Sequence, residues 1–158
     1  MTDVEKRGGA PVGLIADLEA IPAASVMYLR MWFSGPDKQS AVWNDMARTL
    51  GSDKGRRALQ AFESICSLCG RHGRRPLVRH AMCCKCVGSD EACFANFIST
   101  AADGEREDTL LMATLLVRPD MAPALASLAV EFGIALKQMN LASPKEAAAI
   151  RPLQTTLH

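Results

Sequence analysis

A short cysteine-rich segment places the strongest constraint on this chain. The stretch CSLCGRHGRRPLVRHAMCCKC, residues 66–86, holds five of the six cysteines in the 158-residue sequence. Its two Cys-x2-Cys pairs, Cys66/Cys69 and Cys83/Cys86, are thirteen residues apart, and such spacing is typical of zinc sites. Four thiolates at about 2.3 Å from one ion complete a tetrahedron and leave no open position. The sequence therefore predicts a structural Zn²⁺ site with these four ligands.

Other groups compete for the same ion. The alternative ligands are His80, Cys84 and Cys93, because three thiolates with one imidazole also make a sound zinc site. Four thiolates can instead hold an iron–sulfur cluster, although the spacing fits neither common ferredoxin pattern. Free thiols packed as small hydrophobic side chains would explain Cys66 and Cys69 but explain the crowded CCKC poorly. Zinc is the expected cofactor, and an iron–sulfur cluster is the alternative.

The N-terminus and the hydropathy pattern bear on location. No eighteen consecutive residues are apolar, as a transmembrane helix would require. Asp17 and Glu19 stand where a signal peptide would be apolar or small. We therefore expect a cytoplasmic protein with no membrane attachment, whose cysteines serve metal or redox chemistry rather than disulfide bonds.

The remaining sequence predicts an all-α fold. Hydrophobic residues make up 49% of the chain and aromatic residues only 5%, so the apolar set is dominated by helix formers such as Ala, Leu and Met. We expect a single domain of about seven helices, eight if every short one forms, at residues 10–152, with a metal-pinned loop insertion and a metal-binding segment at 66–93. Residues 1–9 and 153–158 would be flexible. Periodicity and capping residues place the helices at 12–18, 22–33, 37–50, 52–70, 89–102, 105–117, 121–139 and, opened by the capping box SPKE, 143–152.

Two helices carry further information. The helix expected at 52–70 carries one continuous apolar stripe, formed by Leu59, Phe62, Cys66 and Cys69. Both cysteines should therefore face the core. Residues 125–139, LASLAVEFGIALKQM, weakly resemble the first helix and turn of a helix-turn-helix unit. One uninterrupted amphipathic core helix that tolerates Gly133 is the favoured interpretation.

Positive charge gathers at the cysteines. The chain has a net charge of +1, but residues 54–85 contain eight Lys/Arg and a single acidic residue. A loop fixed by metal would present these side chains as a contact surface for nucleic acid phosphates or for an acidic protein partner. No aromatic residue lies between Phe62 and Phe94, so stacking on single strands is not supported. The contact residues expected are Arg71, Arg74, Arg75, Arg79 and Lys85.

Several catalytic patterns are missing from the sequence. There is no phosphate-binding Gly-x4-Gly-Lys-Ser/Thr, no His-Glu-x2-His and no Gly-x-Ser-x-Gly. An enzyme is therefore not the favoured interpretation. The sequence favours a zinc-braced regulatory or binding module, possible partners being nucleic acid or protein. A zinc-braced protein–protein adaptor and a thiol-based redox sensor are the alternatives, and the sequence leaves the oligomeric state open.

Overall fold

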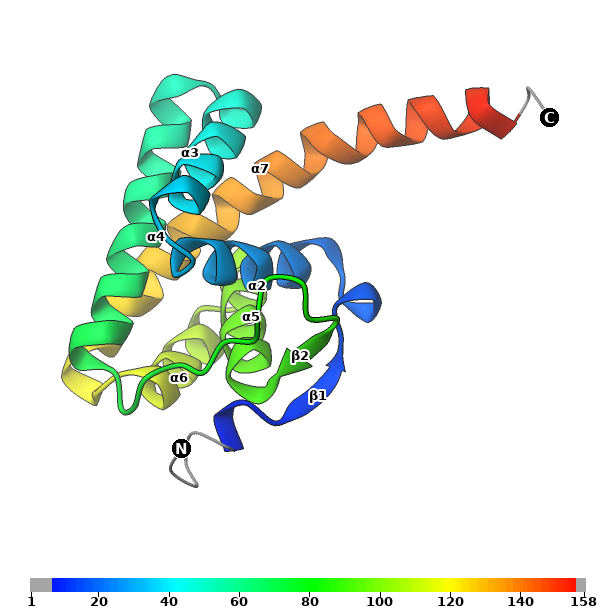
Figure 1. Ribbon diagram of the computed structural model, residues 1–158. Helices are drawn as coiled ribbons and strands as arrows, with labels where there is room; N and C mark the ends of the chain where they lie inside the picture. Colours follow the sequence, from blue (N-terminus) through cyan, green and yellow to red (C-terminus); the bar gives the residue numbers. More distant parts are fainter. Residues whose placement is uncertain (1–6, 156–158) are drawn as a thin grey trace.

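The protein is mostly helical (Figure 1). The computed structural model describes the backbone of residues 7–155 and the side chains of residues 7–141. Within that part of the chain six α-helices occur: α2 (Ala20–Trp32), α3 (Pro36–Leu50), α4 (Ser52–His72), α5 (Ser89–Ala102), α6 (Arg106–Leu116) and α7 (Ala122–Thr155). The short elements are the strands β1 (Pro11–Leu14) and β2 (Cys86–Gly88) and the 3-10 turns η1 (Ile15–Asp17) and η2 (Pro119–Met121). The mainly helical class is confirmed, whereas a metal that pins the loop stays a prediction.

Turn residues end and begin the helices where the sequence indicates. Gly35 and Gly51 adopt φ values of 114° and 87°, in the left-handed region that glycine occupies without strain. Pro36 follows in the first turn of α3, where its missing N–H costs nothing. The expected positions of α2 to α6 agree with the observed bounds, apart from small shifts at the ends.

The predicted helix at 12–18 is wrong. Residues 11–14 form β1, which pairs antiparallel with β2, with Pro11 opposite Gly88 and Leu14 opposite Cys86. The three-residue spacing of Val12 and Ile15 suggested a helical face, yet every residue of β1 is exposed. The partner strand lies more than seventy residues away in sequence, so no local pattern could indicate this pairing.

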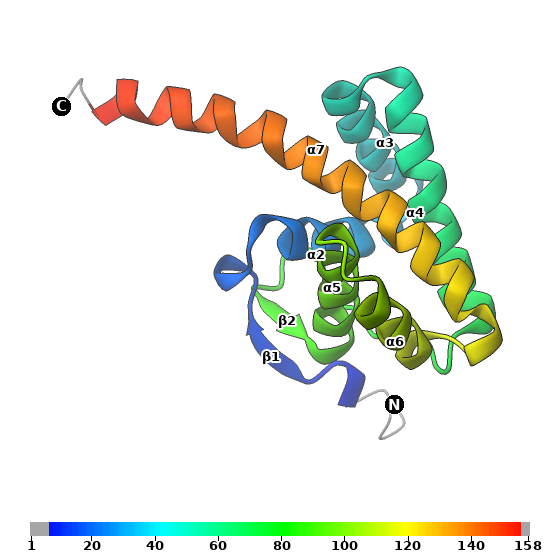
Figure 2. The ribbon, with the colours of Figure 1, turned by 180° about the vertical axis from the view of Figure 1, so that it is seen from behind.

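The core is built around α7, which packs against α4, α5 and α6 and extends beyond them at its C-terminal end (Figures 1 and 2). The Phe62 and Phe132 rings stack at a centroid separation of 4.9 Å, and Trp32 meets Phe62 edge-on at 5.7 Å. Such aromatic pairs add to the free energy gained by burying the rings. They join α2, α4 and α7 into one core.

The long helix α7 tests two predictions made from the sequence. α7 runs without a break through residues 125–139, so the single core helix is confirmed and the helix-turn-helix is wrong. Gly133 lies close against Ala102 of α5, because a Cβ built on it would sit 2.9 Å from the Ala102 nitrogen. α7 also continues through Ser143, so no separate helix begins there. The side chains of that capping box, and the terminal segments 1–6 and 156–158, lie outside the described residues.

One stretch, Pro119–Leu141, is long and apolar enough to cross a membrane by length and composition alone. Its residues Leu125, Ala129 and Phe132 are completely buried against the other helices. These residues form its core face, whereas Ile134 and Leu141 of the same stretch are exposed.

Candidate functional site

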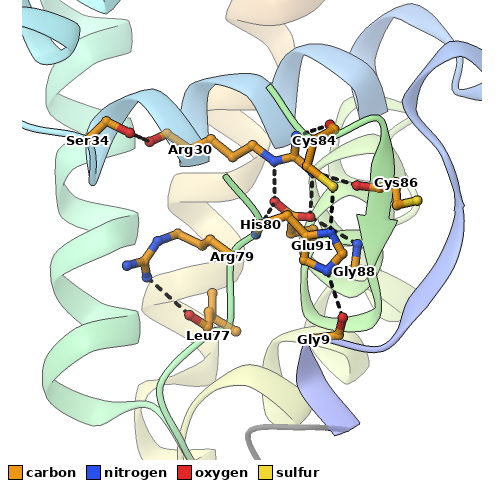
Figure 3. Close-up of polar contacts among 10 residues, drawn as sticks. All are labelled: Gly9, Arg30, Ser34, Leu77, Arg79, His80, Cys84, Cys86, Gly88 and Glu91. Carbon is orange, nitrogen blue, oxygen red and sulfur yellow. Dashed lines mark hydrogen bonds and ion pairs between the residues drawn. The ribbon is translucent and has the colours of Figure 1, made fainter. Parts of the chain in front are cut away.

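Residues 73–88, which connect α4 to α5 and which we call the cysteine loop, are attached to the core by a buried ion pair. Arg30 of α2 donates from Nε to Glu91 of α5 at 2.6 Å and from Nη2 to the same carboxylate at 2.9 Å (Figure 3). Both side chains are fully buried. Arg30 also donates to the carbonyl oxygens of Cys84 and Cys86, at 2.7 Å each. One guanidinium therefore links two helices and the loop.

Glu91 completes this arrangement from the other side. Its carboxylate accepts hydrogen bonds from the backbone N–H of Gly88 at 3.0 Å and of His80 at 3.3 Å. Burial by itself would raise the pKa of Glu91, but the hydrogen bonds and charge of Arg30, with these N–H groups, lower the pKa below its ordinary value. The hydrogen bond to Glu91 likewise raises the pKa of Arg30. Both groups therefore stay charged inside the protein.

A second ion pair holds the first half of the cysteine loop. Arg75 makes two hydrogen bonds to Asp90, of which Nη1 to Oδ2 measures 2.6 Å. Asp90 is 3% exposed and also accepts from the Val78 N–H at 2.7 Å. Gly8 lies directly over this pair, and a Cβ at that position would collide with the Asp90 carboxylate. Two ion pairs therefore attach the cysteine loop to α2 and α5.

Sequence reasoning did not assign a role to Arg30 or Glu91. A signal existed for the first, because Arg30 is the only charged residue in the apolar run SVMYLRMWF. An arginine in such a run needs a partner once it is buried. From the sequence, Glu91 is indistinguishable from an ordinary helix-start acid, because Asp90 stands beside it in the first turn of α5.

Cys84 is a thiol of lowered pKa that contacts a histidine. Its Sγ lies 3.4 Å from Nδ1 of His80, whose Nε2 lies 2.7 Å from the Gly9 carbonyl (Figure 3). A carbonyl accepts only, so Nε2 carries a proton and Nδ1 faces the sulfur. The backbone N–H of Cys86, followed by His80 and the charge of Arg30, lowers the pKa of the Cys84 thiol. The Gly9 carbonyl and Cys84 raise the pKa of His80 against the opposing effect of burial.

The other cysteines have different surroundings. Cys66 and Cys69 are buried on the core face of α4, as the helical stripe predicted. Burial raises the pKa of both thiols, that of Cys69 to about 12. Burial also raises the pKa of Cys93 on α5, which is half-buried. Cys83 is exposed, and the sulfur of half-buried Cys86 points away from Cys84 (Figure 3). All six cysteines are free thiols.

The cysteines of the expected zinc set lie in two environments. Cys66 and Cys69 belong to the core, whereas Cys83 and Cys86 belong to the loop. The structure instead brings together two of the alternative ligands, His80 and Cys84. Among the residues with described side chains, no three His, Cys, Asp or Glu converge on one point. The zinc site therefore stays a prediction.

Most of the expected contact arginines are engaged within the protein. Arg75 pairs with Asp90, and Arg74 donates from Nε to the Thr114 carbonyl of α6. The Arg79 guanidinium lies 4.0 Å from the centre of the Phe33 ring. Arg75 is half-buried, whereas the other four expected contact residues are exposed: Arg71, Arg74, Arg79 and Lys85. The basic segment is therefore partly a structural network rather than a uniform surface.

Comparison with known proteins adds no relative. No family model matches the chain, and neither a curated protein nor a solved structure matches it. The chemistry of the cysteine loop is therefore inferred from its own atoms. In that loop the Cys84 thiol, whose pKa is lowered, lies between the His80 imidazole and the backbone N–H of Cys86, and two ion pairs hold the loop in place.

Proposed function

We propose that the protein is a small, non-enzymatic regulatory module in which Cys84 acts as a redox-sensing thiol. The contact between Cys84 and His80 supports this most directly. The thiolate is the nucleophile in thiol oxidation, and a neighbouring imidazolium together with an N–H donor increases the thiolate fraction at neutral pH. Cys66 and Cys69 have raised pKa values inside the core and make poor competitors.

The reaction proposed is a two-electron oxidation by a hydroperoxide. The Cys84 thiolate attacks the terminal peroxide oxygen, the O–O bond breaks, and a sulfenic acid forms. The leaving hydroxide or alkoxide takes a proton from His80. A second thiol of the loop, Cys83 or Cys86, then attacks the Cys84 sulfur and releases water, leaving a disulfide. Reduction by a dithiol returns both thiols.

The regulatory consequence follows from the attachment of the loop. Arg30 binds the carbonyl oxygens of Cys84 and Cys86, so a disulfide involving Cys84 changes the backbone that this guanidinium holds. The buried Arg30–Glu91 pair would pass that change to α2 and α5. Oxidation is thus expected to alter the stability of the whole domain, and with it the surface offered to a partner.

The test is oxidation of the fully reduced chain with one equivalent of hydrogen peroxide, followed by peptide mass mapping. Addition of dimedone, which traps sulfenic acids, should label Cys84 before any other cysteine. Cys84→Ser should abolish early labelling, whereas Cys93→Ser, which removes a half-buried thiol on α5, should leave it unchanged. First labelling at Cys83 or Cys86 in the native chain would contradict the proposal.

Zinc binding is the second candidate, and the same pair of residues favours it. Two ligands of a tetrahedral zinc ion, a sulfur and an imidazole nitrogen, lie about 3.5 Å apart. The Cys84–His80 separation is 3.4 Å, and the His80–Gly9 contact resembles the outer hydrogen bond that orients a metal-binding histidine. On this proposal His80 and Cys84 hold the ion from their present positions, and Cys83 and Cys86 complete the set after the Cys86 side chain turns toward Cys84.

Elemental analysis of the purified chain for zinc and iron tests this second candidate. Titration with Co²⁺ then reports thiolate ligands through sulfur-to-metal charge-transfer absorption. Cys84→Ser should weaken binding if the loop holds the ion, and Cys66→Ala should weaken it if the set Cys66, Cys69, Cys83 and Cys86 does. A protein that neither contains metal nor binds added Co²⁺ would exclude both ligand sets.

A further inference from the structure

A cleft of about 320 Å³ lies beside the first half of the cysteine loop. Its walls come from the end of α2, the last turns of α4, the segment 73–79 and the start of α5. Arg79 reaches from the loop toward α4 in this region, with Leu77 beneath it (Figure 3). The volume is at the lower end of the range for small-molecule sites.

The floor of the cleft is apolar. Leu29 and Phe94 line it and are buried, while Phe33 and Leu77 form its partly exposed sides. The thiols of Cys66 and Cys69 also face it. Because burial raises the pKa of both, these thiols are neutral at physiological pH. The inner part of the cleft therefore offers contacts to hydrocarbon.

The rim of the cleft is positively charged. Arg74, Arg75 and Arg79 line it, and none of its lining residues is acidic. Asp90 compensates the charge of Arg75 through their ion pair. Glu63 of α4 is near enough to Cys66 to raise the pKa of that thiol, but its own side chain is exposed to solvent. Two guanidinium groups thus face the cleft without a carboxylate in contact among the described residues.

Arg79 is the residue best placed to bind an anion. It donates one hydrogen bond, to the Leu77 carbonyl at 3.1 Å, and rests on the Phe33 ring. A guanidinium carries five N–H donors, so most of them stay available. Burial lowers the pKa of Arg79 below its ordinary value, although the residue as a whole is exposed to solvent. A carboxylate can accept two parallel hydrogen bonds from this guanidinium.

We propose that this cleft binds a small amphipathic carboxylate, with its head on Arg79 and Arg74 and its apolar tail on Leu29 and Phe94. The combination of a cationic rim and an apolar floor selects against inorganic phosphate, which has no apolar part. It also selects against neutral hydrocarbons, which would leave the guanidinium groups without a partner. The site is distinct from Cys84 and does not depend on its oxidation.

Calorimetric titration of the full chain with sodium octanoate, below its micelle concentration, tests this proposal. Saturable one-to-one binding is expected, with 1-octanol and inorganic phosphate each binding at least about tenfold more weakly, the loss that one charge-assisted contact represents. Arg79→Gln should weaken octanoate binding by a similar factor. Arg56→Gln, an exposed arginine near the opposite end of α4, should leave it unchanged.

Three results would overturn the proposal. The first is the absence of octanoate binding at millimolar concentration. The second is equal affinity for octanoate and 1-octanol, which would show that the arginines take no part. The third is an Arg79→Gln variant, folded by circular dichroism, that binds octanoate as the native chain does. Arg79→Lys provides a milder variant, which keeps the charge, loses bidentate geometry and should bind with intermediate affinity.

Discussion

Nε of Arg30 lies 2.6 Å from Oε2 of Glu91, sixty-one residues away in sequence, and neither side chain is exposed to solvent. The pair also binds backbone groups of Cys84, Cys86 and Gly88. A buried ion pair gains little over an apolar replacement of the same shape, because desolvation offsets the attraction. Its value here is that it fixes one arrangement of the cysteine loop against two helices.

Breaking this pair from one side should be costly. Glu91→Gln leaves the Arg30 charge buried without compensation, and we expect a loss of about 3–5 kcal/mol in the free energy of unfolding. Urea denaturation followed by circular dichroism measures it. Arg48→Met is the matched control, because the Arg48–Asp45 pair is exposed and should contribute less than about 1 kcal/mol. Equal effects of the two substitutions would show that the buried pair has no special role.

Stability should also fall in acid through Glu91. Its pKa in the folded protein lies below the ordinary value of 4.5, so its contribution is present above that pH and is lost as pH falls through the folded pKa. Arg30→Met/Glu91→Leu removes the titrating group and should show a shallower loss of stability below pH 4.5. Denaturation midpoints measured from pH 6 to pH 2.5 provide the comparison; parallel curves would contradict this assignment.

The reactivity of Cys84 should depend on His80. In the native chain the rate of alkylation by iodoacetamide at Cys84 should reach half its maximum below the ordinary thiol pKa of 9.0, because the Cys86 N–H and His80 lower the pKa. His80→Gln removes the imidazole and should move this midpoint to higher pH. The rate at Cys93, followed in the same peptide map, should not change. An unaltered Cys84 profile would show that His80 does not activate the thiol.

Two helical glycines should respond in opposite ways to alanine. Gly70 on α4 has open space where a Cβ would stand, so Gly70→Ala should stabilise by about 0.5–1 kcal/mol through helix propensity. Gly133 on α7 has the Ala102 backbone within 2.9 Å of that position, so Gly133→Ala should destabilise by about 1–3 kcal/mol through overpacking. Thermal unfolding of both variants tests the close contact of α5 and α7; stabilisation by both would refute it.

Much of the fold was predictable because its signals are local. The turn glycines Gly35 and Gly51 and the apolar repeat around Phe62 indicate where α3 and α4 begin and which face of α4 is buried. The placement of Cys66 and Cys69 in the core followed from the same repeat. The strand β1 was missed because its pairing partner is distant and its own residues are exposed.

Most of the helices, their buried faces and the concentration of thiols and arginines in one loop depend on residues a few positions apart, and could therefore be predicted from the chain alone. Which of those groups meet depends on the packing of distant segments, and only the folded structure shows it. It placed Cys84 against His80, Arg75 against Asp90 and Arg30 against Glu91. Such contacts depend on how α2, the cysteine loop and α5 pack. The core position of Cys66 and Cys69 could be predicted from the helical repeat, whereas the separation of Cys83 and Cys86 from them is visible only in the packed fold.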